Sequence, residues 1–346
     1  MTKVYVGMSG GVDSSLTAAL LVEQGYDVVG VYMKNWSQDL PGMKCPWADD
    51  LADAKRVAVQ LGIDFKVFDF EKEYKQRVVD YMIDEYKLGR TPNPDIMCNQ
   101  EVKFRLFLDS ALAEGADMIA TGHYARTEHG KLMLAKDTNK DQTYFLYRVT
   151  KEALDKTLFP LGNYDKSEVR EMALARGLYT AGKRDSQGIC FVGQIGIREF
   201  LSQYVTTKPG DIIDADTHKT LGRHDGAIFY TLGQRHGLDV GGGLPYYVVG
   251  KDMDTNEVYV STNLNDAHMW RHELVLSSLH WIGEAPAAGT YQMRIRHRAP
   301  LVSVRLEYRN DTVVVHLDDA QRAATAGQSV VLYDDQTCIG GGIILQ

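Results

Sequence analysis

The sequence predicts an α/β protein with a doubly wound parallel sheet, followed by a small, mainly β linking domain and a C-terminal β-barrel. Strand-like apolar runs alternate with helical patterns through the first part of the chain. A loop of Ser, Gly and Asp joins the first strand to the first helix. From Pro209 onward, short strands and Gly-rich turns replace this alternation. We therefore expect domains at residues 1–203, 204–266 and 267–346.

The expected elements of the first domain follow from apolar periodicity. Val4 to Met8 is apolar and partly β-branched, which predicts a buried first strand. Further strands are expected at residues 27–35, 65–70 and 117–121, with a hairpin at 125–136. Helices are expected at residues 14–25, 49–61, 72–87, 101–114 and 166–176. Such a sheet binds its ligand at the carboxyl ends of the strands, so loops there are the candidate site.

Composition limits the classes of function. The 346 residues carry 38 Lys and Arg against 46 Asp and Glu, a net charge of −8. A chain this acidic is not a general polyanion binder, so any nucleic-acid contact must come from local basic faces. No apolar run approaches the roughly 20 residues of a membrane span, and a strand beginning at Lys3 leaves no room for a signal peptide. We expect a cytoplasmic enzyme with no membrane partner.

The loop from Ser9 to Ser14 suits a polyphosphate. Gly10 and Gly11 let backbone approach a ligand, serine hydroxyls can donate hydrogen bonds, and N–H groups at a helix start favour anions. The Gly-Lys-Ser/Thr ending of a Walker A loop is absent, which argues against γ-phosphate transfer. The loop resembles the pyrophosphate loop (PP-loop) of ATP pyrophosphatases, which cut ATP between its α and β phosphates. The alternative is a plain Gly/Ser turn.

This resemblance implies a nucleotide site with ATP and Mg²⁺. Asp13 is the candidate Mg²⁺ ligand, since hard cations prefer carboxylate oxygens. Met33 could touch adenine or ribose, although core packing is an equally good interpretation. Gly122, at the end of a predicted strand, could let backbone approach the nucleotide. The residues expected around ATP are Gly7, Met8, Ser9, Gly10, Gly11, Val12, Asp13, Ser14, Met33 and Gly122.

Four cysteines, Cys45, Cys98, Cys190 and Cys338, are too scattered for a disulfide scaffold, and none forms a Cys-x-x-Cys pair. This argues against structural zinc or an iron–sulfur cluster. Two prolines in residues 89–99 predict a rigid, non-helical loop that presents Asp95 and Cys98 to one side. Glycines around Cys190 predict a mobile or tightly bent segment. Burial as a small apolar residue is the alternative for each thiol.

Basic residues provide two candidate anion sites. Arg294, Arg296 and Arg298 alternate, so we expect them on one face of one strand, where they either meet an anion or form an exposed rim. Lys140 and Gln142, in a polar turn, could contact phosphate or base, or simply cap a helix.

Over nearly its full length the chain resembles the bacterial tRNA-specific 2-thiouridylases. The matching stretches are residues 9–14, 91–99, 120–124, 140–142, 186–193, 230–237 and 340–343. The resemblance implies ATP-dependent adenylation of O2 of the wobble uridine, followed by sulfur transfer from a cysteine persulfide. It implies that Cys190 carries the persulfide, that Cys98 attacks to release the product and form a Cys98–Cys190 disulfide, and that Asp95 is a general base or orienting carboxylate.

The resemblance also implies the partners, which are tRNA and a sulfur donor, either a cysteine desulfurase or a sulfur-relay protein. The expected tRNA contacts are Asn93, Pro94, Asp95, His123, Lys140, Asp141, Gln142, Arg296, His297 and Gln328. At residues 296–299 the chain has Arg-His-Arg-Ala where the family pattern is of the Arg-Tyr-Arg-Gln type, so charge is retained but the aromatic residue is changed.

Three other functions are open on the residues alone. A small-molecule ATP pyrophosphatase that makes an amide or guanidino product would leave both thiols idle. A redox or sulfur-carrier protein would need a close dithiol, whereas Cys98 and Cys190 are 92 residues apart. Enzymes that insert sulfur at other tRNA positions often use paired Cys-x-x-Cys motifs, which this chain lacks.

Overall fold

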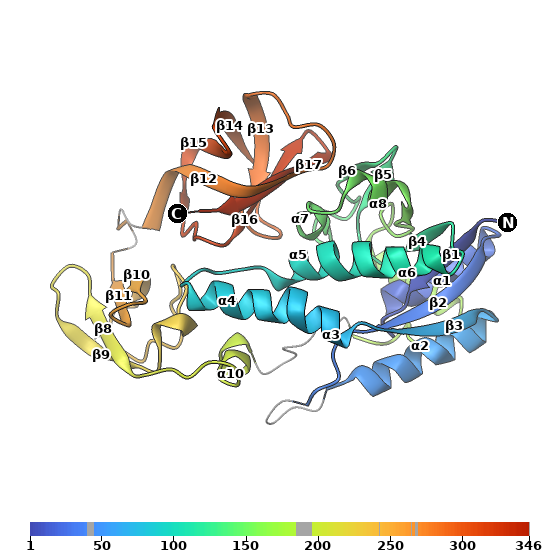
Figure 1. The fold of residues 1–346 in the computed structure, drawn as a ribbon, viewed down its shortest axis with the longest axis horizontal. Coiled ribbons are helices and arrows are strands. Elements are labelled where there is room, and N and C mark those ends of the chain that lie inside the picture. The colour runs from blue at the N-terminus through green and yellow to red at the C-terminus, as the bar shows by residue number, and fades with distance from the viewer. Residues whose placement is uncertain (40–44, 185–195, 242, 264, 267–268, 346) are drawn as a thin grey trace.

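The computed structural model describes residues 1–39, 45–184, 196–241, 243–263, 265–266 and 269–345. The α/β unit forms one end of the molecule, and a small β unit and a β-barrel lie toward the other (Figure 1). Among the helices of these described residues, none is both long and apolar enough to cross a membrane.

The α/β unit contains a five-stranded sheet in the order β3-β2-β1-β4-β7 with every neighbouring pair parallel. Its strands are β1 (Lys3–Gly7), β2 (Asp27–Lys34), β3 (Asp64–Asp69), β4 (Met118–Ala120) and β7 (Thr157–Leu158). Alternate residues of β1 face opposite cores: Val4 and Val6 pack on one face, whereas Tyr5 packs on the other. Burial on both faces explains why every residue of this strand after Lys3 is apolar.

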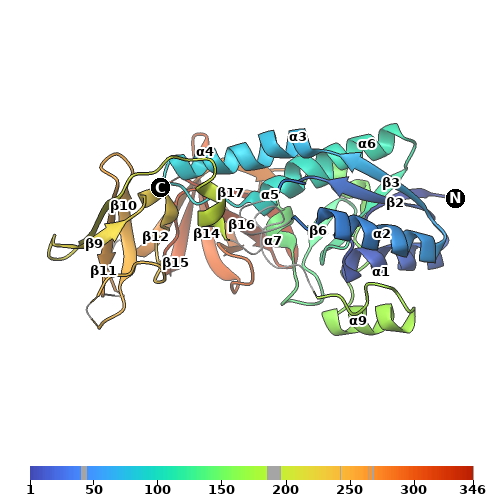
Figure 2. The same ribbon diagram turned by 90° about the horizontal axis from the view of Figure 1, so that it is seen from below.

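Helices cover both faces of the sheet, which confirms the doubly wound prediction (Figure 2). One face carries α1 (Val12–Glu23) and α2 (Trp47–Leu61), with α9 (Lys166–Ala175) packed on α1. The other carries α3 (Glu71–Tyr74), η1 (Lys75–Asp80) and α4 (Tyr81–Lys87), then α5 (Pro94–Cys98), η2 (Asn99–Leu106) and α6 (Phe107–Ala113). Both η1 and η2 are π-helical, so each helix run contains a wide turn.

The prediction of a non-helical loop through residues 89–99 is wrong in its second half, where α5 begins at Pro94. Pro94 occupies the first helical position, where its missing N–H costs no hydrogen bond. The Asn93 side chain caps the helix by accepting from the backbone N–H groups of Asp95 at 3.1 Å and Ile96 at 3.2 Å. The second proline therefore starts this helix instead of excluding it.

The middle unit has its own sheet, in the order β10-β11-β8-β9. Its elements are β8 (Gly210–Asp214), β9 (Thr220–His224), η3 (Ala227–Phe229), β10 (Tyr247–Asp252) and β11 (Glu257–Ser261), preceded by α10 (Ile197–Leu201). Ile212, Tyr230 and Val260 belong to a small core of this unit.

The C-terminal strands close into a barrel, because β12 pairs with both β15 and β17. They are β12 (Trp270–Trp281), β13 (Gly289–Arg294), β14 (Val302–Arg309), β15 (Thr312–Arg322), β16 (Ser329–Asp334) and β17 (Thr337–Ile344). The hairpin of β5 (Arg126–Glu128) and β6 (Lys131–Met133) extends this sheet, because β6 pairs with β17. The hairpin is followed by α7 (Thr143–Leu146) and α8 (Lys151–Asp155).

The expectation of three arginines on one strand face is wrong. Strand β13 ends at Arg294, and the chain turns over residues 295–298, where Arg298 has a φ of 65°. Arg294 is buried, whereas Arg296 and Arg298 are exposed. Alternation in sequence does not place them on one face once the strand has ended.

Candidate active site

The loop after β1 meets the loop after β4 at the switch point of the sheet, because strands 2 and 3 lie on one side of β1 and β4 lies on the other. Helix α1 starts there with Gly11 as N-cap and no side-chain capping bond. Gly10 has a φ of 74°, and a Cβ on it would lie 2.3 Å from the carbonyl oxygen of Asp50. The loop is therefore tightly fitted against α2, and an uncapped helix start favours an anion.

Two serines hold the shape of this loop. The backbone N–H of Ser9 donates to the Ser14 hydroxyl at 3.1 Å, and that hydroxyl donates to the carbonyl of Gly11, also at 3.1 Å. The two hydroxyl oxygens are 3.3 Å apart. These hydrogen bonds hold the backbone of residues 9–14 in one conformation without a ligand.

Asp13 is held by residues that the sequence analysis did not select. Lys166, at the start of α9, contacts both carboxylate oxygens of Asp13 at 2.7 and 2.8 Å, and the hydroxyl of Tyr124 donates to one of them at 2.9 Å. Within the described residues, no group of three His, Cys, Asp or Glu side chains could hold a metal ion. A single carboxylate is nevertheless a suitable protein ligand for Mg²⁺ when phosphates and water complete its coordination.

Gly122 and Met33 make close protein contacts beside the loop. A Cβ on Gly122 would lie 2.9 Å from the backbone nitrogen of Ser14, so glycine lets β4 end against the start of α1. A Cβ on Gly7 would lie 2.9 Å from the methyl group of Met33. Met33 also packs against the core on the face of the sheet that Tyr5 occupies. Contact of Met33 and Gly122 with ATP stays a prediction.

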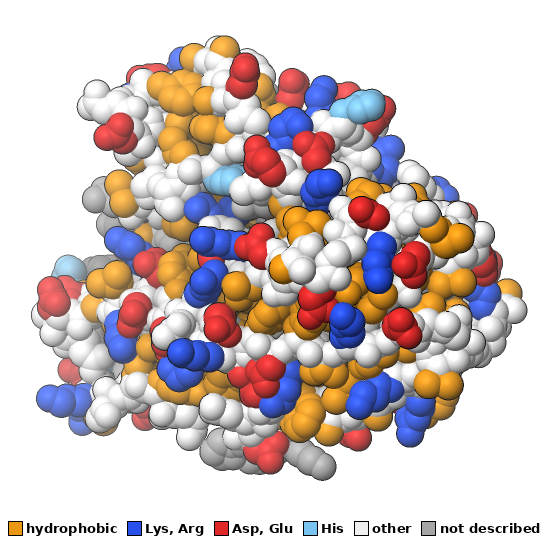
Figure 3. Space-filling view, turned by 45° about the vertical axis from the view of Figure 1, so that its right-hand side comes forward, with side chains coloured by type: hydrophobic (Ala, Val, Ile, Leu, Met, Phe, Trp, Pro, Cys, Tyr) orange, Lys and Arg blue, Asp and Glu red, His pale blue; other side chains and the backbone are white. Residues whose placement is uncertain are grey.

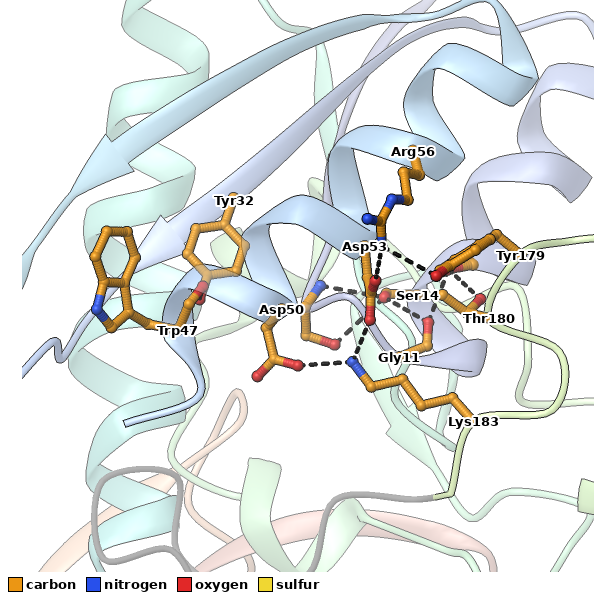
Figure 4. A network of polar contacts seen from close by, with 12 residues as sticks. Gly11, Ser14, Tyr32, Trp47, Asp50, Asp53, Arg56, Tyr179, Thr180 and Lys183 are labelled. Carbon is orange, nitrogen blue, oxygen red and sulfur yellow. Dashed lines mark hydrogen bonds and ion pairs between the residues drawn. The ribbon is translucent and has the colours of Figure 1, made fainter. Parts of the chain in front are cut away.

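A polar network on the α2 side was also missed from sequence (Figure 4). Lys183 donates to Asp50 at 2.7 Å and to Asp53 at 2.8 Å. Burial opposes the charge of Lys183, but these two hydrogen bonds outweigh it and raise the pKa of the amine. Arg56 continues the network by contacting Asp53 at 2.9 Å and the hydroxyl of Tyr179 at 3.0 Å. The network ties residues 179–183 to α2 next to the nucleotide loop.

Helix α5 brings two of the three predicted catalytic residues onto one short element. Asp95 lies in its first turn, and burial raises the pKa of its carboxyl group, while Lys103 partly offsets this effect. Cys98 ends the helix, and its thiol is covered, with 3% of the residue exposed. Cys190 lies outside the described residues. Cys45 and Cys338 are buried, as expected for packing residues.

A cavity of about 190 Å³ joins the segment before α5 to the barrel. Four of the predicted tRNA contacts contribute to its lining, which is Thr91, Pro92, Asn93, Tyr144, Ile295, Arg296, His297, Gln328 and Ser329. The His297 ring packs on Phe145 with centroids 4.6 Å apart. Burial lowers the pKa of His297 to about 4, and Arg298, Arg294 and Lys140 lower it further. His297 is therefore neutral at pH 7 in a basic environment.

Two other protein residues predicted to contact tRNA, Asp141 and Gln142, use their side chains for hydrogen bonds within the protein. Asp141 is buried, and its carboxylate accepts from the backbone of Ala135 at 3.0 Å, from Thr143 at 2.8 Å and from Arg294 at 2.9 Å. These contacts occupy the Asp141 side chain and join its turn to the barrel. The side chain of Gln142 accepts from the backbone N–H of Tyr124 at 2.9 Å.

His123 is also buried. Its Nδ1 lies 2.8 Å from the hydroxyl of Thr121, and its ring packs against Phe104 and Phe159. Burial, with help from Lys103, lowers the pKa of His123. Contact of Lys140, Asp141, Gln142 and His123 with tRNA stays a prediction.

Taken together, the parallel sheet and the Gly- and Ser-rich loop at its switch point are typical of α/β proteins that bind a nucleotide. Family models match successive parts of the chain: the tRNA methyl transferase HUP domain at residues 2–194, the tRNA methyl transferase PRC-barrel domain at 198–262 and the aminomethyltransferase beta-barrel domain at 271–344. The HUP domain family of the first model implies the use of ATP.

Curated relatives match the chain along its length. The tRNA-specific 2-thiouridylase MnmA of Exiguobacterium sibiricum is 47% identical, covering 99% of this chain and 94% of the relative. The enzyme of the same name from Alkaliphilus oremlandii is 47% identical, covering 100% and 97%. That of Bacillus subtilis is 46% identical, covering 99% and 95%. The chain belongs to the tRNA-specific 2-thiouridylase family.

Proposed function

We propose that this protein thiolates C2 of the wobble uridine of tRNA, using ATP to activate O2 and two cysteines to deliver sulfur. The observation that carries the proposal is the 190 Å³ cavity, which sets Asn93, next to α5, against Arg296, His297 and Gln328. Enzymes that act on one base of an RNA turn that base out of its stack into a pocket, so we assign this cavity to the target uridine. The small-molecule alternative gives this basic, domain-spanning cavity no role.

The first step makes O2 a leaving group. Oxygen on C2 leaves poorly, so O2 attacks the α-phosphate of ATP and pyrophosphate departs, which leaves O2 as part of AMP. The loop from Ser9 to Ser14 would bind the phosphates, with the uncapped start of α1 facing their charge. Mg²⁺, held by Asp13 and the phosphates, would supply charge neutralisation.

The second step moves sulfur. The terminal sulfur of a persulfide on Cys190 attacks C2, the C2–O2 bond breaks, and AMP leaves. The Cys98 thiolate then attacks Sγ of Cys190, which forms a Cys98–Cys190 disulfide and leaves sulfur on C2. A dithiol reductant reopens the disulfide, and a persulfide-bearing sulfur donor protein reloads Cys190. Asp95 lies two positions after Asn93, which lines the cavity, and its raised pKa makes it a better proton acceptor, so it serves as general base for the uridine.

This order of events requires Cys98 to become accessible. Its thiol is covered in the present conformation, and it ends α5 where the π-helical turn of η2 begins. A wide turn of this kind is less regular than an α-helix and is often found at functional sites. Rearrangement of α5 would uncover the thiol when tRNA and the Cys190 segment are both engaged.

The test uses Cys98→Ser and Cys190→Ser, each incubated with ATP, unmodified tRNA and a persulfide source. We expect both to lose 2-thiouridine formation, measured by mass spectrometry of nucleosides, while binding tRNA with nearly unchanged Kd. Cys338→Ala, at a buried barrel position, is the matched control and should retain activity. Normal thiolation by both serine variants would reject the assignment.

A further inference from the structure

A second cavity, of about 330 Å³, adjoins the uridine cavity and shares Arg296 and Gln328 with it. Its lining residues are Thr231, Leu232, Gly233, Gln234, Arg296, Arg322, Ala323 and Gln328. We name the two cavities together the junction groove. Its larger part is of a size typical for ligand pockets, about 300 Å³ or more. The proposed adenylation and sulfur-transfer steps do not use residues 231–234 or Arg322.

The junction groove lies where all three domains meet. A Cβ on Gly233 of the middle domain would lie 2.8 Å from Cβ of Ala323, which follows β15 of the barrel. A Cβ on Gly327 of the barrel would lie 2.8 Å from the backbone nitrogen of Thr91 in the catalytic domain. Both glycines have positive φ, of 81° and 88°. Such close backbone packing gives the groove a defined shape.

Two arginines line the groove, and none of its lining residues is acidic. Nη2 of Arg296 donates to the carbonyl oxygens of Arg322 at 3.3 Å and Ala323 at 2.9 Å, which orients the guanidinium. Arg322 stacks over the ring of Tyr247 of the middle domain at 5.1 Å, and its Nε is buried without a hydrogen-bond partner. A guanidinium has five donors in a fixed fork, which suits phosphate.

The charge of the groove differs from that of the surface in Figure 3, where acidic and basic side chains are interspersed. A mixed surface on a protein of net charge −8 gives little general attraction for RNA. Affinity for a polyanion must therefore come from local sites in which cations are held together without acidic neighbours.

We propose that the larger cavity binds the backbone phosphate of a nucleotide next to the target uridine, with Arg322 as its main ligand and Arg296 shared between the two subsites. The middle domain thereby contributes to substrate binding through residues 231–234. This inference rests on the proposed function, because it takes the smaller cavity as the uridine site. It assigns a phosphodiester of single-stranded RNA as the ligand.

The first experiment measures Kd for an unmodified anticodon stem-loop as a function of salt. Arg322→Gln should weaken binding about 5- to 10-fold and reduce the slope of log Kd against log salt by about one, as expected for one lost phosphate contact. Arg322→Lys should recover part of that slope. Arg305→Gln, the same change at an exposed position of β14 outside the groove, should leave both quantities unchanged.

The second experiment places single neutral methylphosphonate linkages on either side of the target uridine. One such linkage should weaken binding by wild type but not further weaken Arg322→Gln, because both changes remove the same contact. Additive losses at every linkage, or an Arg322→Gln salt slope equal to that of Arg305→Gln, would overturn this inference alone. Failure of wild type to bind or thiolate the stem-loop would instead overturn the proposed function.

Discussion

Two aspartate–cation pairs in this molecule differ in their access to water. Asp141 and Arg294 pair at 2.9 Å with side chains only 1% and 9% exposed, and they join the α/β unit to the barrel. Asp13 and Lys166 pair at 2.7 Å beside the nucleotide loop, with side chains 30% and 12% exposed. A buried pair cannot be separated without leaving a desolvated charge, whereas water or phosphate can replace a partner at the second site. The first pair is suited to architecture and the second to exchange with a ligand.

The largest effect on stability is expected from Arg294→Met. The substitution leaves the Asp141 carboxylate buried without its cation, so we expect a loss of about 3–5 kcal/mol in the free energy of unfolding at pH 7. Urea denaturation measures this loss. Arg305→Met, at an exposed barrel position, is the control and should change stability by less than about 0.5 kcal/mol.

The same variant should show a characteristic pH dependence. Burial raises the pKa of Asp141 even in the native protein, although Ala135, Thr143 and Arg294 oppose the rise. A carboxyl group with a raised folded-state pKa favours folding at pH values below its unfolded pKa, about 4, and loses that contribution as pH rises through the folded value. Removing Arg294 raises this pKa further, so protonation of Asp141 stabilises the variant more than it stabilises wild type. The difference in the free energy of unfolding between the two proteins should therefore become smaller toward pH 4. If the difference in the free energy of unfolding did not change with pH, the loss of stability would not come from the unpaired Asp141 carboxylate.

Lys183→Met should lower the free energy of unfolding by less than Arg294→Met does, because the contacts of Lys183 with Asp50 and Asp53 are only partly shielded from water. Loss of two hydrogen bonds to carboxylates should cost about 1–2 kcal/mol in urea denaturation. Arg184→Met removes the same charge from the adjacent exposed residue and should have little effect. Equal losses in the two variants would show that net charge, and not the network, determines stability.

The smallest effect on stability, with a large effect on activity, is expected from Lys166→Met. Its partly exposed pair with Asp13 should contribute no more than about 1 kcal/mol. If Lys166 exchanges from Asp13 to a phosphate of ATP, tRNA-dependent pyrophosphate release should fall about 100-fold. Lys55→Met, on the exposed side of α2, should leave release unchanged. A stability loss as large as that of Arg294→Met would remove the distinction between the two pairs.

The sequence predicted the parallel sheet, both covering helix layers and the change to β structure because these depend on local periodicity. Val4, Tyr5 and Val6 already alternate between two apolar cores, and a run of this kind needs no knowledge of distant residues. The prediction failed where a rule was applied too broadly. Proline breaks a helix interior, but Pro94 stands at the first position of α5, and alternation places residues on one strand face only while the strand continues, whereas β13 ends at Arg294.

The polar networks of the site could not be found in the same way. Lys183 pairs with carboxylates 130 and 133 positions away, and Lys166 pairs with Asp13 across 153 positions. No periodic pattern links residues at such separations. A weak signal was present, since Lys183 lies just before the segment that contains Cys190, and Asp50 and Asp53 lie at the start of a predicted helix. Only the fold shows that Lys183 and the start of this helix lie together next to the nucleotide loop.

The pairing of β6 with β17 has a consequence for how a substrate must fit. Leu132 and Met133 of β6 pair with Cys338 and Thr337 of β17, so one continuous sheet links the hairpin that follows β4 to the barrel. Any rotation of the barrel relative to the five-stranded sheet must therefore carry this hairpin with it or break its pairing with β17. We therefore expect a bound tRNA to change its own shape more than it changes the arrangement of the barrel and the sheet.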